Sequence, residues 1–184
     1  MSKHSTEPGF SELEAAFCYY VGMDTDGKIT DSIEIRRALS RELEFIRSIE
    51  RVTMVNPWSH KQWDDELRRR DTVLYVAVWN NLVVGYMAMI LRPSSAVILR
   101  MAVAPELQRN GIGSLLISLA KEKLRPKRRE VLQALVGGRD IGTQLFFKSQ
   151  GFVADKVLPA DESVVYDGSE ELYRFHYRYN ASAE

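Results

Sequence analysis

The sequence predicts a single domain of α/β (α+β) class with six to seven strands. Its 184 residues suit one domain, and a hydrophobic content of 45% is enough to bury a sizeable core. Runs with the alternation or β-branched content of strands are interspersed with runs whose apolar residues recur at helical spacing. We therefore expect strands and helices to contribute to one core.

The first expected elements are a strand and two helices. Residues 32–36 alternate as a strand does, and residues 39–55 place apolar side chains on one helical face. The Asn56-Pro57 step ends this helix, because the residue before a proline is biased away from helical conformation. The pattern Ser59-x-x-Gln62 is a capping box, which predicts a short helix immediately after it.

The centre of the chain predicts three consecutive strands. Two β-rich runs, residues 73–79 and 82–91, flank an Asn80-Asn81 pair that is typical of a hairpin turn. A third run, residues 96–103, follows a turn at Pro93. These runs indicate an antiparallel meander.

The last part of the chain mixes helices and strands. A helix is expected to begin at the glycines near residue 111 and to reach about Arg125, because Pro126 cannot continue it. The remaining expected elements are a strand at 131–136, a helix at 141–149 and two closing strands at 152–158 and 172–179.

Charge and cysteine content exclude several classes of function. Lysine plus arginine and aspartate plus glutamate both number 25, so the net charge is zero, which argues against a nucleic acid or an anionic membrane as the main partner. The one cysteine, Cys18, excludes a disulfide framework and a four-cysteine metal site, and no metal is expected. No apolar stretch is long enough to span a bilayer, and the N-terminus is a poor signal peptide, so we expect a cytoplasmic protein.

Residues 1–31 are interpreted as an N-terminal extension, and residues 32–184 as the domain. Positions 1–9 are polar, whereas residues 10–21 place apolar side chains at helical spacing. A short helix there could pack on the domain or on a second copy in a homodimer.

Two glycines stand where a helix is expected to begin, in the run Gln108-Arg109-Asn110-Gly111-Ile112-Gly113. Glycine in a helix is less favourable than alanine by up to about 1 kcal/mol, so this placement needs a reason. One reason is that missing Cβ atoms let an anion approach the unpaired backbone N–H groups of the helix start. The other is structural: a positive φ at one glycine and close packing at the other. The spacing excludes a P-loop and a three-glycine dinucleotide fingerprint.

The longer run MAVAPELQRNGIGSLLI resembles the acetyl-CoA-binding motif of the GNAT superfamily of N-acetyltransferases. The resemblance extends from about Ile33 to about Tyr179 and includes Pro57-Trp58-Ser59, Gly85-Tyr86 and residues 145–152. The Pro-Trp-Ser and Gly-Tyr motifs are most similar to ribosomal-protein alanine N-terminal acetyltransferases. The resemblance implies the GNAT fold: a mixed, mostly antiparallel sheet of six to seven strands, with helices on both faces of the sheet and splayed central strands.

The resemblance also implies acetyl-CoA as cosubstrate and an amine acceptor, either a protein N-terminus or a small molecule. The arm of the coenzyme would enter between the strand that ends at Val103 and the strand at 131–136, with its diphosphate on the glycine loop. The residues implied to contact the coenzyme are Met101, Ala102, Val103, Gln108, Arg109, Asn110, Gly111, Ile112, Gly113, Ser114, Asp140 and Phe147.

The catalytic residues of the resembled subfamily are replaced in this sequence. With the chain aligned on Gly151-Phe152, the glutamate that acts as base in those enzymes falls at Leu135. The tyrosine that acts as acid falls at Phe147, and an asparagine falls at Asp140. The sequence therefore predicts an acyltransferase with non-standard catalytic residues or, as the alternative, a coenzyme-binding sensor or interaction protein that has lost catalysis.

The acceptor class bears on that choice. An α-amine has a pKa of about 7.7–8.0, so about a third is neutral near pH 7.5, whereas a lysine amine is neutral only about one time in a thousand. Loss of the catalytic base therefore lowers the transfer rate less when the acceptor is an α-amine. This favours a protein or peptide N-terminus as the acceptor.

Three remaining polar residues have two possible roles each. Tyr173 and His176 lie on the last expected strand, which borders the substrate site in the GNAT fold, and they are the candidates for acid–base catalysis. Both could instead be packed or surface residues of that strand. Arg100 could face an acidic acceptor or pair with an internal acid.

Overall fold

The computed structural model describes residues 33–159 and 171–179. Its strands are β1 (Glu34–Arg37), β2 (Thr72–Trp79), β3 (Leu82–Leu91), β4 (Ser95–Val103), β5 (Val131–Gly137), β6 (Val153–Pro159) and β7 (Glu171–Arg178). Its helices are α2 (Leu43–Thr53), α3 (His60–Leu67), α4 (Ile112–Glu122) and α5 (Ile141–Ser149), with 3-10 turns η1 (Ser40–Glu42) and η2 (Pro105–Leu107). The predicted extension and its helix at 10–21 lie outside the described residues.

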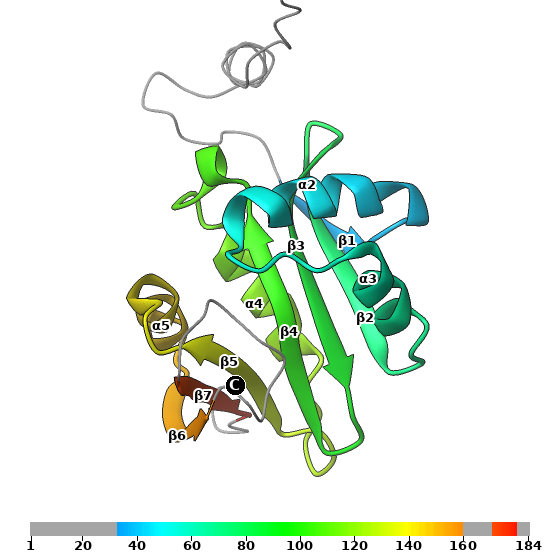
Figure 1. The fold of residues 1–184 in the computed structure, drawn as a ribbon. Helices are drawn as coiled ribbons and strands as arrows, with labels where there is room; N and C mark the ends of the chain where they lie inside the picture. The colour runs from blue at the N-terminus through cyan, green and yellow to red at the C-terminus, as the bar shows by residue number, and fades with distance from the viewer. Residues whose placement is uncertain (1–32, 160–170, 180–184) are drawn as a thin grey trace, which may run out of the picture.

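One seven-stranded sheet, in the order β1-β2-β3-β4-β5-β7-β6, forms the centre of the molecule (Figure 1). Every neighbouring pair is antiparallel except β4 and β5, which are parallel. This arrangement confirms the predicted mixed, mostly antiparallel sheet.

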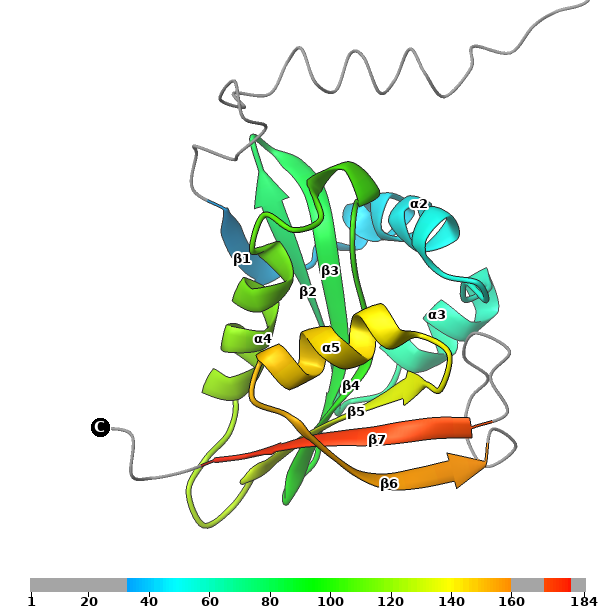
Figure 2. The same ribbon diagram turned by 90° about the vertical axis from the view of Figure 1, so that its left-hand side faces the viewer.

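Helices cover both faces of the sheet. On one face α2 and α3 bury Ile46 and Trp63 against Val76 and Tyr86. On the other face, turned toward the viewer in Figure 2, α4 and α5 pack on a larger core that includes Phe147. The two cores confirm the helix–sheet–helix layering implied by the resemblance.

The predicted hairpin and capping box are both present. Asn80 and Asn81 have φ angles of 46° and 64°, as a tight turn between twisted antiparallel strands requires. At the start of α3, the Ser59 N–H donates to Gln62 Oε1 at 2.9 Å, and the Gln62 N–H donates to the Ser59 hydroxyl at 3.3 Å. Local side-chain chemistry alone accounts for both features.

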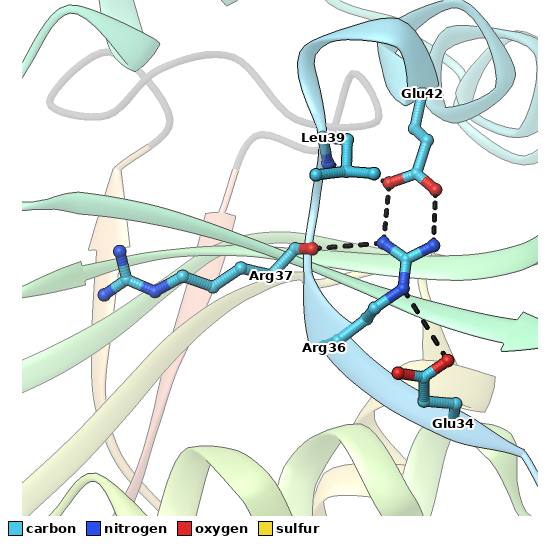
Figure 3. A network of polar contacts seen from close by, with 5 residues as sticks. All are labelled: Glu34, Arg36, Arg37, Leu39 and Glu42. Carbon is cyan, nitrogen blue, oxygen red and sulfur yellow. Dashed lines mark hydrogen bonds and ion pairs between the residues drawn. The ribbon is translucent and has the colours of Figure 1, made fainter.

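The predicted helix at 39–55 is shorter than expected, because its first turn is the 3-10 turn η1. Glu42 ends this turn and accepts hydrogen bonds from Arg36 on β1 at 2.9 and 2.6 Å and from the Leu39 N–H at 2.8 Å (Figure 3). These bonds hold the pKa of Glu42 below its ordinary value, with the Arg36 guanidinium as the main cause. A contact from another element therefore sets where α2 begins.

Helix α4 also ends earlier than expected, at Glu122 rather than Arg125. The Arg125 N–H donates to the Arg129 carbonyl at 2.7 Å, which turns the chain back on itself around Pro126. This bridge replaces the last helical turn that the sequence predicts.

The central strands separate because β4 contains a bulge. Ala88 of β3 pairs with Arg100, whereas the next residue, Met89, pairs with Ile98, so Leu99 is an extra residue on β4. Pairing with β5 also stops at Ile98. Beyond this point β4 and β5 diverge, which confirms the splayed strands that the resemblance implied.

Candidate active site

A pocket of about 640 Å³ lies where β4 leaves β5, and it is lined from both faces of the sheet. Gly113 and Phe146 line it on the α4–α5 face, whereas Met54 and Val55, from the segment after α2, line it on the opposite face. A continuous sheet would separate these residues. The break in β4–β5 pairing therefore makes a passage through which two molecules can approach each other from opposite faces.

The glycine loop forms one end of this pocket. Gly111 is the N-cap of α4 with φ of 82°, and an added Cβ would have nothing within 4 Å. The first N–H groups of α4, from Ile112 to Ser114, have no acceptor within the helix, and no side chain among the described residues caps it. These residues line the pocket together with Arg109. Free N–H groups, the helix dipole and an arginine together suit a phosphate group.

The second glycine fits the close packing of the structural explanation rather than open access for an anion. A Cβ on Gly113 would lie 3.2 Å from the Phe146 ring of α5. Gly113 therefore allows close packing of the two helices, whereas open access to the backbone is found at Gly111. The structural explanation, with positive φ at one glycine and tight packing at the other, holds beside the phosphate explanation.

The structure brings together nearly all of the residues implied to contact the coenzyme. Asn110 is the exception: its side-chain amide donates to the Leu107 and Gln108 carbonyls at 3.4 and 3.3 Å, within the loop itself. The residues that line the pocket are Met101, Ala102, Val103, Gln108, Arg109, Gly111, Ile112, Gly113, Ser114, Asp140 and Phe147. Their contacts with a coenzyme remain a prediction.

The edge of β4 that faces the gap offers backbone groups to the pocket. The Ala104 N–H donates to the Val84 carbonyl on β3 at 2.9 Å. Backbone groups alternate in direction along a strand, so the Val103 N–H is directed away from β3, toward the gap. On the same edge the Val103 carbonyl accepts a hydrogen bond from the Gln108 side chain at 3.1 Å.

Polar side chains of α5 and of its two caps fix the wall opposite the loop. Asp140 is the N-cap of α5 and accepts a hydrogen bond from the Thr143 N–H at 3.0 Å, so its carboxylate serves the helix. Gln144 donates to the carbonyls of Gly137 and Gly138 at 2.8 and 3.0 Å. Gln150 donates to the Ser114 hydroxyl at 3.1 Å.

These glutamines were missed from the sequence because they hold the site by contacts between elements. Gln144 reaches the end of β5, and Gln150 reaches the first turn of α4. The one available signal was the position of Gln150 immediately before a glycine that ends α5 with φ of 78°.

The positions aligned with the family's base and acid, Leu135 and Phe147, both line the pocket. The Phe147 side chain is 4% exposed, and its ring lies edge-on to Phe152 with centroids 5.0 Å apart. Neither side chain has a titratable group, so neither can act as a general base or acid. Both positions border the gap, and their correspondence to the family's base and acid remains a prediction.

Tyr173 and His176 lie on β7, and neither is among the described residues that line the pocket. His176 Nδ1 lies 3.4 Å from Asp155, which also accepts two hydrogen bonds from Arg174 at 2.9 and 2.7 Å. Those bonds are the main reason that the pKa of Asp155 is lowered. The catalytic role of Tyr173 and His176 stays a prediction.

Arg100 pairs with an internal acid rather than with an approaching acceptor. Its Nη1 lies 3.0 Å from the carboxylate of Glu50 on α2. Both side chains are buried, with 5% and 0% of their surfaces exposed. The extra residue at Leu99 makes this possible, because Ile98 packs on the α4 side of the sheet while Arg100 faces α2.

Two further features bear on function. Among residues 33–159 and 171–179, no three His, Cys, Asp or Glu side chains are grouped as a metal site requires. In the same residues, no helix has both the length and the apolar character needed to cross a membrane.

Several solved structures share this fold. The chain matches the Escherichia coli ribosomal-protein-S18-alanine N-acetyltransferase with a TM-score of 0.71 and 18% identity, over 83% of this chain and 97% of that one. It matches Arabidopsis thaliana NAA60 in complex with acetyl-CoA with a TM-score of 0.69 and 15% identity, over 82% and 100%. For Ard1 from Thermoplasma volcanium the TM-score is 0.69 and the identity 22%, over 82% and 99%.

At these identities the likeness shows the fold. No curated protein sequence matches the chain. The family described as Acetyltransferase (GNAT) matches residues 43–152, from the start of α2 to just beyond α5, which is more than half of the sequence. The chain therefore belongs to the GNAT acetyltransferase family.

Proposed function

We propose that the protein transfers the acetyl group of acetyl-CoA to a primary amine, with the α-amine of a protein or peptide as the preferred acceptor. The passage between β4 and β5 supports this proposal most directly. It has a phosphate-type cradle on one face of the sheet and the segment after α2 on the other. The named activities and ligands of the structural neighbours agree with it.

The residues of the loop fit a coenzyme A diphosphate. The amides at the start of α4 and the Arg109 guanidinium would hold its charge, and Gly111 presents backbone rather than side chain. The exposed edge of β4 from Met101 to Val103 would pair with the amide groups of the pantetheine arm. When bound, acetyl-CoA supplies a thioester whose carbonyl carbon can be attacked by an amine.

The Val103 N–H is the best placed donor for charge stabilisation. It is directed toward the gap, and it belongs to a strand held in place by β3. A fixed backbone donor of this kind stabilises the negative charge that develops on the acetyl oxygen during attack.

The surroundings of the amine favour a weak base. Leu135 and Phe147 line the pocket where the resembled subfamily has its base and acid, and both are apolar. Apolar surroundings disfavour the ammonium form and so lower the pKa of a bound amine. The pKa of an α-amine is already close to neutral pH, so a small decrease makes most of it neutral. The pKa of a lysine amine would have to fall by about 2.5 units more to reach the same neutral fraction.

A peptide with both a free N-terminus and an internal lysine tests the proposal. At pH 7.5, in the presence of acetyl-CoA, mass spectrometry should find the α-amine acetylated at least about tenfold faster than the lysine, given their neutral fractions. The rate should rise as pH increases through the pKa of the α-amine, because only the neutral amine attacks. Faster modification of the lysine would contradict the preference.

A wider panel of amines distinguishes acetyl transfer from the competing function. A protein that binds coenzyme A but acetylates no amine in a panel of peptides, polyamines and amino acids would be a coenzyme sensor or interaction protein. The apolar residues at positions 135 and 147 are the observation that keeps this alternative relevant.

A further inference from the structure

The Glu50–Arg100 pair is a buried ion pair beside the pocket. Glu50 is fully buried on α2, where one carboxylate oxygen accepts a hydrogen bond from Trp63 Nε1 at 2.7 Å and the other lies 3.0 Å from Arg100 Nη1. Removing two charges from water is costly, and apolar residues of similar volume often give equal or greater stability. A gain in stability is thus a weak explanation for the pair.

Arg100 also connects this pair to the segment between α2 and α3. Its Nη1 donates to the Asn56 carbonyl at 2.9 Å, and its guanidinium lies 4.8 Å from the centre of the Trp58 ring. We call residues 54–58 the acceptor segment, because Met54, Val55 and Asn56 line the pocket on the face opposite the α4 loop. Arg100 thereby joins one wall of the pocket to the central sheet.

The acceptor segment has no helix or strand of its own to hold it. It begins where α2 ends at Thr53 and finishes at the Ser59 cap of α3. The Asn56 carbonyl and the Trp58 ring, which Arg100 contacts, lie in the middle of this stretch. A planar guanidinium can serve a carboxylate, a carbonyl and an aromatic face together, which a lysine ammonium cannot.

We propose that the Glu50–Arg100 pair is a positioning device for the amine acceptor. Glu50 orients Arg100, and Arg100 fixes the acceptor segment against β4 so that the amine meets the acetyl group in line. The proposal rests on the proposed function, since it assumes that the acceptor enters from the face of α2. It assigns the pair an effect on acceptor binding and none on coenzyme binding, which involves the opposite end of the pocket.

The central test is the double variant Glu50→Gln/Arg100→Met. It removes both charges together, so no uncompensated charge remains buried, and the glutamine oxygen can still accept from Trp63. We expect the KM for the acceptor peptide to rise about tenfold, since small misplacements of a reactant are costly, while affinity for coenzyme A stays within about twofold. Amide hydrogen exchange in the acceptor segment should become faster.

Two further variants make the result specific. Arg100→Lys keeps the charge but loses the planar fork, and should show an intermediate acceptor KM. The matched control Arg36→Met/Glu42→Gln removes another Arg–Glu pair, located at the β1–η1 junction and not among the pocket-lining residues. It should lower thermal stability and leave both the acceptor KM and exchange in the acceptor segment unchanged.

Two outcomes would overturn the proposal. Equal losses of coenzyme and acceptor affinity in Glu50→Gln/Arg100→Met would mean that the pair supports the whole pocket. Unchanged exchange in the acceptor segment would mean that it fixes nothing there. Hydrogen exchange is measured without turnover, so it tests the positioning role even if the wild-type protein acetylates no amine. The absence of turnover would contradict the proposed function and would leave the exchange result valid.

Discussion

The two ends of the pocket are built from different kinds of chain. The proposed coenzyme end comes mainly from one continuous stretch, residues 101–114, which offers backbone N–H groups of β4 and α4 to the pocket. The proposed acceptor end is assembled from α2, the acceptor segment and β4, which the side chains of Glu50 and Arg100 connect. A site that binds through backbone N–H groups depends mainly on the local conformation of the chain. A site that depends on side chains needs particular residues from distant parts of the sequence to be brought together by the fold.

Gly113→Asp should produce the largest effect, and it acts on the coenzyme end alone. Aspartate in the first turn of a helix interacts favourably with the helix dipole, so α4 should persist. Gly113 lines the pocket, so the same carboxylate would add a negative charge beside the proposed diphosphate site, and like charges about 4 Å apart near a protein surface repel by roughly 4 kcal/mol. Coenzyme A should then bind at least about 100-fold more weakly, as measured by calorimetry or thermal shift.

Gly113→Ala is the matched control, because it adds the Cβ near Phe146 without charge. It should weaken coenzyme binding only a few-fold. Gly111 is less suitable for this comparison, since its φ of 82° would strain any other residue. Equal effects of the alanine and aspartate variants at position 113 would show that packing, and not anion binding, explains the glycine.

Phe147→Tyr should have a smaller effect, on turnover. It tests the part of the pocket between the proposed coenzyme end and the proposed acceptor end. If position 147 corresponds to the family's acid, the added hydroxyl should leave coenzyme affinity nearly unchanged and raise turnover by up to about tenfold where thiolate departure limits the rate. A general acid typically contributes about 10²–10⁴-fold, and we expect less here because the hydroxyl would be added without the surroundings of the family's tyrosine. Steady-state kinetics with saturating peptide measure the change.

Phe146→Tyr is the neighbouring control, because that ring also lines the pocket. It should give no gain in turnover. A fall in turnover for Phe147→Tyr, with stability and coenzyme affinity unchanged, would show that position 147 does not correspond to the acid.

Glu42→Gln should have the smallest effect on function and sharpens the contrast between the two Arg–Glu pairs. Loss of the charged hydrogen bonds from Arg36 should lower the free energy of unfolding by about 1–2 kcal/mol at pH 7. The folded-state pKa of Glu42 is lowered, so its contribution is full above the unfolded-state pKa and is lost as pH falls through the folded-state value. The free energies of unfolding of wild type and variant, measured with urea, should therefore converge as pH falls below the ordinary pKa of a glutamate, with the acceptor KM unchanged at pH 7.

A larger stability difference at pH 3 than at pH 7 would contradict the assigned ionisation of Glu42. A raised acceptor KM in Glu42→Gln would weaken the distinction between the β1–η1 junction and the pocket.

The sequence predicted the order of the described elements because helical and strand periodicities are local properties. Residues 141–149 and 82–91 form a helix and a strand with the expected bounds. The main errors concern two helix ends that contacts with other residues determine. Arg36 on β1 binds Glu42 just before α2, and the Arg129 carbonyl accepts a hydrogen bond that turns the chain after α4. An end fixed by a partner elsewhere in the chain has no local pattern.

The sequence by itself indicated the glycine loop at the start of α4, because the resemblance to the GNAT motif is carried by one continuous run of residues. Only the tertiary structure decided the acceptor end. Strict alternation along β4 would place Arg100 on the same face as Ile98, toward α4, but the extra residue at Leu99 places Arg100 toward α2 and Glu50. That bulge arises from how β3 and β4 pair, and the partner that it selects lies fifty residues away in sequence, so no local pattern in the chain could have indicated it.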